Sequence, residues 1–574
     1  LSAVLLYLDR ICISFAERFI KQDLSLSDGQ MSWVLSAFFW SYALGQVPSG
    51  WLSDRFGGRV TLTAYVLLWS VLTAATGLAG GLASLLAFRL GFGLAQAGAY
   101  PTAALLLSKW VPFTARATAS SVVAFGGRIG GAVAPLLTGA LIVVLVPVSV
   151  SSRLTADDLL DVYKLSMQIA RPEREPNITL SARILEWADD EFRQSVRHYA
   201  ELYATELDRI RAAAENDGEG TGLTQSKLDP PRDADVVVII AELNRVLDWH
   251  ELYDERLFAE VPIEREATKL LSRPREELTP SQLQRLNRLL LEAVYPDGIR
   301  KVYVAGWRKT MFVFGVAGII VAVMFWPSCR DLPAKHPRCN VAEQALIEQV
   351  RPATEPRSHA SARGLPIDDL LRSRSLWLSC LSQFGTNLGW VFLITWLPRY
   401  LQEVHQVPVL ARGLMASVPL FAGWFGMLGG GWLTDLLTRR LGLRWGRGLP
   451  MSLTRFVAMA AFLIVLVPMS PWTATICFAL VAFATDLGVS SVWAYMQDVG
   501  GRHVASILGW GNMWGNLGAA ASPLLIGWMV AQHKNWDAAF LTCAAAFLVS
   551  GVAALGVDAT ISIVPIEDEN KPTS

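Results

Sequence analysis

The sequence predicts an all-α membrane protein with twelve transmembrane helices in two six-helix halves, and with a soluble α-helical insert between helices 5 and 6. Three observations support this prediction. Of the 574 residues, 52% are hydrophobic and only 17% are charged, whereas a soluble protein carries about 25% charged residues. Long apolar runs recur along the chain, and two short motifs repeat in its two halves. The composition excludes a disordered chain, a basic nucleic-acid-binding domain and an ordinary cytosolic enzyme.

The predicted spans follow from length, because a helix needs about 20 mostly apolar residues to cross the hydrocarbon core. They lie near residues 1–19, 32–52, 60–79, 83–107, 117–147, 310–327, 376–400, 411–436, 449–469, 472–496, 504–531 and 536–558. The first run begins at Leu1, already inside a helix and without a signal peptide, so we expect that the start of the chain is truncated.

Orientation follows from the basic residues of the short loops, because these residues resist translocation. One set of loops is rich in them: Arg55, Arg59, Lys109, Arg116, Arg439, Arg440, Arg444, Arg447 and Arg502, together with the linker 328–374. The opposite set has only Arg18, Lys21, Arg399, Arg412 and Lys534. We therefore expect both termini in the cytoplasm and the insert on the periplasmic or extracellular side of the plasma (inner) membrane.

The predicted domains follow from these spans. They are helices 1–5 (residues 1–150), the insert (151–308), helix 6 (309–327), a cytoplasmic linker (328–374), helices 7–12 (375–560) and a cytoplasmic tail (561–574). The insert holds 22 Lys or Arg and 30 Asp or Glu, a net charge of −8 in a chain that is neutral overall. Apolar periodicity predicts insert helices over 181–215, 237–259 and 280–295, the last with a Thr279 cap and Pro280 in its first turn.

Two internal repeats support the division into halves. Residues 50–54 (Gly-Trp-Leu-Ser-Asp) recur as 431–435 (Gly-Trp-Leu-Thr-Asp), and residues 135–139 (Pro-Leu-Leu-Thr-Gly) recur as 523–527 (Pro-Leu-Leu-Ile-Gly). The offsets of 381 and 388 residues are close enough to indicate one duplication of six helices. Transporters built from two parallel halves show this pattern and bind their substrate near mid-membrane between the halves.

The loop Gly50-Trp-Leu-Ser-Asp54-Arg55-Phe-Gly57-Gly58-Arg59 resembles the signature of the major facilitator superfamily, and residues 431–440 are a weaker second copy. Its glycines permit a tight turn, while an aspartate there can lie at a helix N-terminus and pair with a basic neighbour. We expect a cytoplasmic latch that opens when the halves rock; the alternative is a simple positive-inside anchor. The latch residues are Gly50, Asp54, Arg55, Gly57, Arg59, Asp435 and Arg439.

Within that superfamily the chain is similar to the anion:cation symporters, which include sugar-acid transporters, sialin and vesicular glutamate transporters. The resemblance is carried by Tyr7 to Ser14, Ser36 to Gln46, Arg89 to Pro101 and Thr395 to Tyr400. It covers the twelve spans and leaves out the insert. It implies that Arg10 contacts the anion and that Tyr42 is a binding-site hydroxyl.

Charged residues inside the spans are functional candidates, because a charge at the centre of a membrane helix costs several kcal/mol. Arg10 suits a carboxylate, since a guanidinium binds it bidentately. Its neighbour Asp9 diverges by about 100° on the helix and is a candidate proton carrier. Arg89 and Gln96 lie two turns apart on one helix face, and the related symporters usually have a proton-coupling Glu at the position of Gln96. Gln96 cannot titrate, which puts ordinary proton coupling in doubt.

Three further positions complete the candidate site. Asp486 is either the compensating proton-coupling acid or the partner of a buried basic side chain. Arg128, inside a Gly-rich stretch, is either a second anion-binding charge, which we favour, or the structural partner of Asp9 or Asp486. Asn512 is a candidate sugar-hydroxyl ligand, although asparagines at this position also join helices. No metal site or cofactor motif is present, so we expect neither.

Together these features predict a secondary transporter, not an enzyme, that moves an organic anion, such as a sugar acid or another monocarboxylate, by alternating access with proton coupling. Its partners are the anion, the lipid bilayer and protons; no nucleic acid is expected, and the insert is expected to dock a protein partner. The alternative is a transporter-like receptor whose outer domain senses a ligand or partner without net flux.

Overall fold

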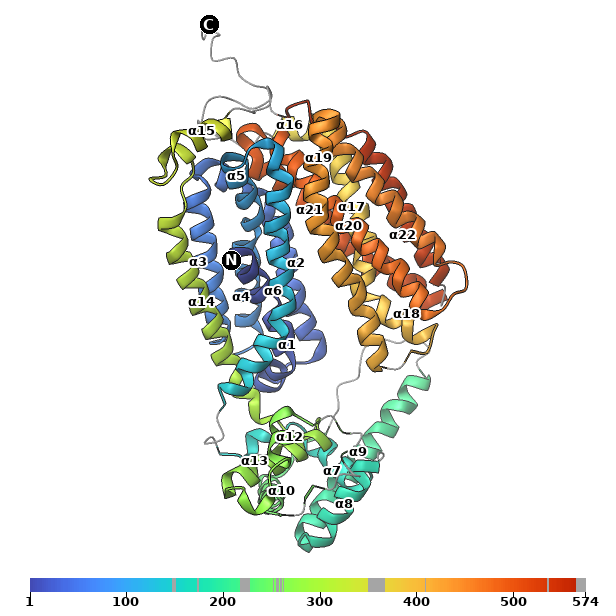
Figure 1. Cartoon of the computed structure of the whole chain (residues 1–574). Helices are drawn as coiled ribbons and strands as arrows, with labels where there is room; N and C mark the ends of the chain where they lie inside the picture. The colour runs from blue at the N-terminus through green and yellow to red at the C-terminus, as the bar shows by residue number, and fades with distance from the viewer. Residues whose placement is uncertain are drawn as a thin grey trace. The chain divides into compact units, whose positions relative to one another are not determined.

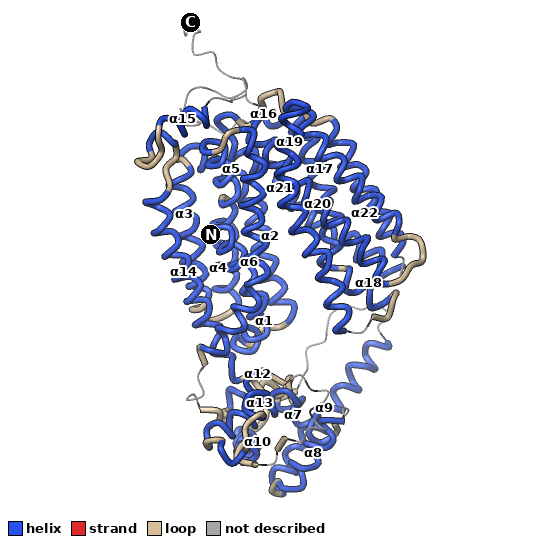
Figure 2. The backbone as a smooth tube through the Cα atoms, in the orientation of Figure 1, coloured by secondary structure: helices blue, strands red, loops and turns tan. Residues whose placement is uncertain are grey.

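The computed structural model describes residues 1–146, 151–172, 175–216, 228–250, 252–253, 258, 261, 263–348, 367–407, 409–533 and 536–563. Within these ranges the chain forms helices joined by turns and loops, and it contains no β-strand (Figure 2). The chain divides into two compact units. The bundle unit comprises Leu1–Ser14, Gly29–Leu136 and Met311–Ser574, and the insert unit comprises Phe15–Asp28 and Leu137–Thr310.

The first half of the bundle contains the predicted helices 1 to 6. They are α1 (Ser2–Leu24), α2 (Asp28–Phe56), α3 (Gly58–Thr76), α4 (Leu82–Ala97), α5 (Ala99–Trp110), α6 (Arg116–Val144) and α14 (Gly306–Ser328). Although α14 is distant in sequence, its Gly315 packs against Ser70 of α3, and Figure 1 shows the two helices side by side. The predicted span 83–107 matches the apolar helical segment Leu82–Trp110, which is divided into α4 and α5 because Pro101 cannot donate a hydrogen bond to Ala97 and its ring crowds that carbonyl. Helix α4 therefore ends at Ala97.

The second half contains the predicted helices 7 to 12. They are α17 (Arg374–Thr395), α18 (Leu397–Glu403), α19 (Val409–Ile464), α20 (Pro471–Val499), α21 (Val504–His533) and α22 (Trp536–Leu555). Helix α19 joins the predicted spans 8 and 9 across a sharp turn at Gly442, whose φ is 79°. Pro398 likewise separates α18 from α17. Between the halves lie α15 (Val341–Glu348) and α16 (Ile367–Arg372), while residues 349–366 fall outside the described part.

Seven helical segments in the described part are long and apolar enough to cross a membrane. They are Gly58–Thr76, Leu82–Trp110, Phe113–Val144, Val302–Ser328, Leu414–Ile464, Pro471–Val499 and Trp536–Leu555. Every predicted span falls largely on a helix, but crossing by all twelve stays a prediction. Helices α1, α2, α17 and α21 are not among the seven segments, and each places polar side chains on the cavity described below.

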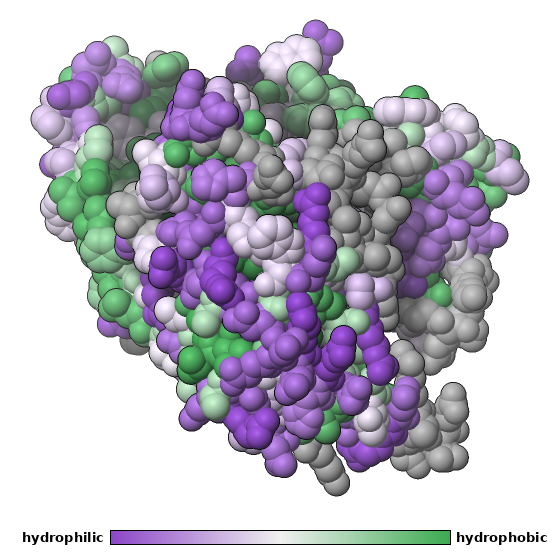
Figure 3. All heavy atoms as spheres, turned by 90° about the horizontal axis from the view of Figure 1, so that it is seen from below, coloured by the Kyte–Doolittle hydropathy of each residue, from purple (hydrophilic) through white to green (hydrophobic). Residues whose placement is uncertain are grey.

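The insert unit is a helical cluster with its own core. Its longer helices are α7 (Val162–Ala170), α8 (Glu175–Trp187), α9 (Asp190–Asn216), α10 (Asp233–Val246), α12 (Arg265–Leu271) and α13 (Pro280–Val294). The Thr279 cap is confirmed, since its hydroxyl accepts a hydrogen bond from the Gln282 amide. Apolar side chains such as Phe192 and Leu290 are fully buried. Hydrophilic residues predominate on the insert face seen in Figure 3.

Two of the predicted insert helices have different bounds in the structure. The single helix over 181–215 is two helices, because Arg193 donates to the terminal carbonyls of Leu185 and Glu186 and so ends α8. The helix over 237–259 stops at Val246, where the Asn287 amide donates to the carbonyls of Leu247 and Trp249. A side chain from outside the helix bonds carbonyls at its C-terminal end in each case. Residues 217–227 fall outside the described part of the chain.

The insert unit also includes the ends of three bundle helices, α1, α6 and α14. Asp23 near the end of α1 forms ion pairs with Arg300 and Arg308, and it accepts a hydrogen bond from the Trp307 indole at 3.2 Å. The side chain of Gln22 accepts a further bond from the Lys301 backbone. The end of α1 and the start of α14 are therefore fastened together inside this unit.

Candidate functional site

A polar cavity of about 230 Å³ lies in the bundle unit between the two halves. The first half contributes side chains from α1, α2, α5 and α6, and the second half from α17, α19, α20 and α21. Its charged lining residues are Arg10, Arg128, Arg455 and Asp486, and its amide-bearing residues are Gln383, Asn387, Asn512 and Asn516. The lining therefore has three positive charges and one negative charge.

Arg10 lies on this lining in an aromatic cage. Its guanidinium carbon is 4.9 Å from the ring centres of Tyr7 and Phe38 and 4.5 Å from that of Tyr42. Such cation–π contacts stabilise a guanidinium without neutralising it. No described carboxylate lies within ion-pair distance of Arg10, and its Nη2 has no hydrogen-bond partner. The structure thus places Arg10 and Tyr42 together on the cavity lining, with no described carboxylate paired to the guanidinium.

Gln96 positions Arg10. Its Oε1 accepts from Arg10 Nε at 3.2 Å, and its Nε2 donates to the Leu6 carbonyl at 3.0 Å. The side chain is fully buried and does not line the cavity. A carboxylate at this position would neutralise Arg10, whereas the amide orients it and leaves its charge uncompensated.

Asp9 and Arg89 lie behind the cavity lining. Asp9 diverges from Arg10, as predicted, and both of its carboxylate oxygens are buried without a hydrogen-bond partner. Arg89 lies 5.0 Å from the ring centre of Phe38, on which Arg10 also packs. The two arginines are therefore neighbours across one aromatic ring. Neither Asp9 nor Arg89 makes an ion pair among the described residues.

Arg128 and Asp486 form an ion pair across the two halves. Arg128 Nη2 lies 2.8 Å from Asp486 Oδ1 and 3.0 Å from Oδ2. The guanidinium also lies over the Trp390 ring, 4.8 Å from its centre. Of the two roles considered for Arg128, the structure shows the pairing with Asp486. Whether the pair also binds an anion or a proton stays a prediction.

Arg455 on α19 is not among the residues predicted from the sequence. It is 2% exposed, and it donates from Nε to Thr386 at 3.1 Å and from Nη1 to the Met451 carbonyl at 2.7 Å and to Thr454 at 3.1 Å. No carboxylate of the described chain pairs with it. The sequence did contain one indication of a functional role for Arg455. It lies inside the predicted span 449–469, where a charged side chain costs several kcal/mol of free energy.

The asparagines of α21 and the serines of α20 near the cavity divide into two groups. Asn512 and Asn516 both line the cavity, and Asn516 also donates to the Asn512 carbonyl at 2.8 Å. Ser490 instead bonds Ser121 of the other half at 2.5 Å, and Ser491 bonds Thr434 at 2.8 Å. The serines therefore join helices, and the asparagines face the cavity.

The first copy of the repeated loop contacts the opposite half through Asp54. Its carboxylate accepts hydrogen bonds from the Ala505 and Ser506 backbone amides at 3.0 and 2.8 Å and from the Ser506 hydroxyl at 2.6 Å. Asp54 thus lies at the N-terminus of α21, which favours a negative charge. A Cβ on Gly50 would lie 2.4 Å from the Ala505 carbonyl oxygen, so only glycine permits this approach.

The basic residues of the first copy lie outside this contact. Arg55 is exposed over the rings of Trp51 and Phe56, so the pairing expected between Asp54 and a basic neighbour is absent from the described contacts. The Arg59 backbone amide donates to Asp331, and its side chain donates to the Trp326 carbonyl. Gly57 has φ 86°, and Gly442, two residues beyond the second copy, also has a positive φ of 79°. These residues fix the loop within the first half.

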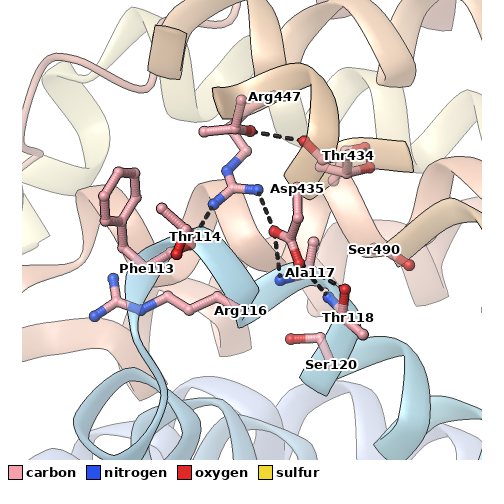
Figure 4. A network of polar contacts seen from close by, with 12 residues as sticks. Phe113, Thr114, Arg116, Ala117, Thr118, Ser120, Thr434, Asp435, Arg447 and Ser490 are labelled. Carbon is pink, nitrogen blue, oxygen red and sulfur yellow. Dashed lines mark hydrogen bonds and ion pairs between the residues drawn. The ribbon is translucent and has the colours of Figure 1, made fainter. Parts of the chain in front are cut away.

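The second copy makes the reciprocal contact and adds a charge network. Asp435 accepts from the Ala117 and Thr118 amides at the N-terminus of α6, and it pairs with Arg447 at 3.3 Å (Figure 4). Asp498 pairs with both Arg447 and Arg116 at 2.8 and 3.0 Å. All four charged side chains are buried. The sequence contained little indication of this network, because all four residues lie within two residues of a predicted span end.

Arg439 contributes less to this contact. Its Nη2 donates to the Thr114 carbonyl at 3.4 Å, and the residue is exposed. Both repeat aspartates therefore bind the first turn of a helix in the opposite half, with Arg447 as the buried cation of the second copy.

Comparison with protein families decides the identity of this two-half bundle. The model of the major facilitator superfamily matches residues 1–149 and 302–523. The chain belongs to the major facilitator superfamily. It is accordingly a multi-pass membrane transporter and not an enzyme. The matched ranges leave out residues 150–301.

The relatives found within this superfamily are described as transporters of organic acids. The chain is 22% identical to a probable sulfoacetate transporter of Cupriavidus necator over 97% of this chain and 91% of the relative. It is 22% identical to a probable galactarate/D-glucarate transporter of Bacillus subtilis over 93% and 85%. The crystal structure of the E. coli fucose:proton symporter aligns with a TM-score of 0.55 at 11% identity, covering 96% of both chains, and so shares the fold.

Proposed function

We propose that the protein is a secondary active transporter that moves an organic anion of the sugar-acid class by alternating access, coupled to protons. The observation that carries this proposal is Arg10, a guanidinium on a cavity between the halves with no carboxylate partner and an unused Nη2. A guanidinium keeps its charge and binds a carboxylate bidentately. The relatives that carry organic acids support the substrate class.

The contacts of Asp54 near the end of α2 and of Asp435 before the Gly442 turn of α19 support the alternating-access part of the proposal. Asp54 and Asp435 each bind a helix N-terminus of the opposite half through hydrogen bonds that rigid-body rocking would break. Farther along α6 and α20 the halves also meet at Arg128 and Asp486. In the proposed cycle the aspartate contacts open when the cavity turns toward the cytoplasm and form again when it turns outward.

Proton coupling is assigned to Asp486, with Asp9 as the alternative, because Gln96 cannot titrate. In the pair seen here, Asp486 neutralises Arg128. When the substrate anion binds in the cavity, the added negative charge near the pair favours a proton on Asp486, so the anion and the proton enter the cavity together. This coupled entry accounts for symport. Asp9 is also a carboxylate that could take up a proton, but it is buried without a hydrogen-bond partner and does not line the cavity.

The test of the anion site is uptake of a radiolabelled panel of sugar acids into proteoliposomes that contain the purified full chain. Arg10→Ala is expected to abolish uptake and leave the protein folded, as judged by gel filtration and thermal unfolding. The matched control is Arg399→Ala, because Arg399 pairs with Glu403 on α18 away from the cavity. Normal uptake by Arg10→Ala overturns the site.

The coupling assignment has a separate test. Asp486→Asn is expected to lose accumulation against a gradient but to keep exchange of internal for external anion, because the neutral side chain mimics the protonated state permanently. Accumulation equal to that of the unmodified chain rejects Asp486 and directs attention to Asp9→Asn. The role of the insert as a docking domain for a protein partner rests on its separate helical core and stays a prediction.

A further inference from the structure

The charges on the cavity lining are unbalanced. Three arginines and one aspartate face the space, and one arginine, Arg128, is already paired with that aspartate. Arg10 and Arg455 remain, and no carboxylate of the described chain pairs with either of them. The cavity lining therefore presents two positive charges without an ion-pair partner among the described residues.

These two arginines belong to opposite halves of the bundle. Arg10 lies on α1, and Arg455 lies on the part of α19 that follows the turn at Gly442. Each is fixed in place by neutral groups: Arg10 by Gln96 and aromatic rings, and Arg455 by Thr386, Thr454 and the Met451 carbonyl. Two rigid cations on one cavity, one from each half, form a binding arrangement that a single ligand can bridge.

Energetics favour a bound ligand over a purely structural role for Arg455. A buried charge without a counter-charge costs several kcal/mol, and proteins retain such charges mainly where they act on ligands or ions. Hydrogen bonds to Thr386, Thr454 and a carbonyl satisfy donors but leave the full charge. The structural alternative would require a carboxylate near Arg455, and none of the described residues supplies one.

We propose that the substrate is a dianion with an acid group at each end, one bound by Arg10 and the other by Arg455. This inference rests on the proposed function and narrows its substrate class from organic acids in general to acids with two acid groups. The polar middle of such a ligand faces Gln383, Asn387 and Asn512. Gln383 Nε2 is buried without a hydrogen-bond partner and is available as a donor to a hydroxyl group.

A dianion also links ligand binding to movement of the halves. Its two acid groups neutralise both charges and connect α1 with α19, so the loaded cavity can close with no net charge left inside. An acid with one carboxylate compensates one arginine and leaves the other buried and unpaired. The diacid is therefore favoured both for binding and for the step in which the halves close around it.

The experiment compares two acids that differ in one group. Galactarate and D-galactonate share a six-carbon chain and hydroxyl pattern, but only galactarate has a carboxylate at each end. Saturable uptake of each into proteoliposomes gives the ratio of their half-saturation concentrations. A charge-assisted hydrogen bond contributes about 1.5–3 kcal/mol, so the unmodified chain is expected to prefer the diacid by roughly 10- to 100-fold.

Substitution of Arg455 tests the cause of that preference. Arg455→Gln is expected to reduce the ratio to near one, and Arg455→Lys, which keeps the charge without the guanidinium fork, is expected to give an intermediate ratio. Arg10→Gln weakens both acids, and the control Arg399→Gln preserves the ratio. An unchanged ratio in a folded Arg455→Gln protein overturns the proposal.

The outcomes separate this inference from the proposed function. If the unmodified chain takes up neither these acids nor any other organic acid, the proposed function fails. If it transports acids but prefers D-galactonate, the dianion proposal fails and the transporter assignment stands. Should Arg455→Gln not fold, the preference of the unmodified chain and the Arg455→Lys ratio still decide between the outcomes.

Discussion

Two groups of buried arginines in the same bundle have opposite surroundings. The first group lies in the charge network around the second copy of the loop, here called the latch network. In it Arg116 and Arg447 pair with Asp498, and Arg447 also pairs with Asp435. On the cavity, Arg10 and Arg455 are held by aromatic rings, hydroxyls and carbonyls, with no carboxylate partner among the described residues. The same side chain is thus compensated in one region and left uncompensated in the other.

The presence or absence of a carboxylate partner distinguishes arginines with a structural role from the arginines that we propose to bind a ligand. The latch charges neutralise one another and keep two helix termini against the opposite half. The cavity charges are positioned equally well, and under the proposed function a ligand supplies their counter-charge. Arg128 lies between these two cases, because its partner Asp486 is also on the cavity lining. A proton on Asp486 would remove the negative charge that compensates Arg128, so Arg128 would then be uncompensated like Arg10 and Arg455.

The strongest test of this comparison removes one arginine from each region. Arg447→Met leaves Asp435 and Asp498 short of a partner, and breaking a buried ion pair costs about 3–5 kcal/mol. Arg455→Met removes a charge that has no ion-pair partner, so we expect a much smaller change in stability. Thermal unfolding of the full chain in detergent measures both. Equal destabilisation by the two substitutions would show that the regions do not differ.

A second test gives a cavity arginine the partner that it lacks. Gln96→Glu places a carboxylate on Arg10 and makes this position resemble the latch. The new carboxylate competes with the substrate, so the affinity for the anion is expected to fall roughly tenfold or more, the equivalent of about 1.4 kcal/mol or more. Gln96→Met is the control, since it removes the hydrogen bond to Arg10 without adding charge. Similar losses in both variants would mean that orientation of Arg10 matters and its charge does not.

The smallest expected effect concerns the first copy of the latch. Asp54 binds the N-terminus of α21 and Ser506 but no arginine. Asp54→Asn keeps a capping oxygen and loses the negative charge, which is worth up to about 1 kcal/mol at a helix terminus. Asp435→Asn also deprives Arg447 of a carboxylate and should destabilise the protein more. A larger effect at Asp54, measured by thermal unfolding, contradicts the assigned roles.

Much of the fold was predictable because it depends on local hydrophobicity. Each predicted apolar run falls largely on a helix of the bundle, and the repeat of residues 50–54 at 431–435 indicated the two halves. The helices have other bounds than predicted where a single side chain interrupts them. Pro101 divides the fourth span, and in the insert Arg193 and Asn287 end helices by bonding their carbonyls. The proline was visible in the sequence, but the two hydrogen bonds depend on the folded chain.

The candidate site was predictable only in part. Arg10, Asp9 and Tyr42 stand in motifs close together in the chain, so their grouping followed from the resemblance. The Arg128 and Asp486 pair joins residues 358 positions apart, and sequence left its two roles open. Arg455 was visible as a charge inside a span, yet the absence of a carboxylate beside it emerges only from the three-dimensional arrangement. Ion pairing in a membrane bundle is set by helix packing, which one sequence does not specify.

The central claim is that the cavity carries an anion across the membrane and does not merely bind it. Counterflow measures this most directly: proteoliposomes that contain the full chain are loaded with unlabelled galactarate and diluted into a trace of labelled galactarate. Transport predicts a transient accumulation of label that is absent in Arg10→Ala vesicles. Saturable binding of the label to the purified chain without accumulation in any vesicle would contradict the account and identify a receptor.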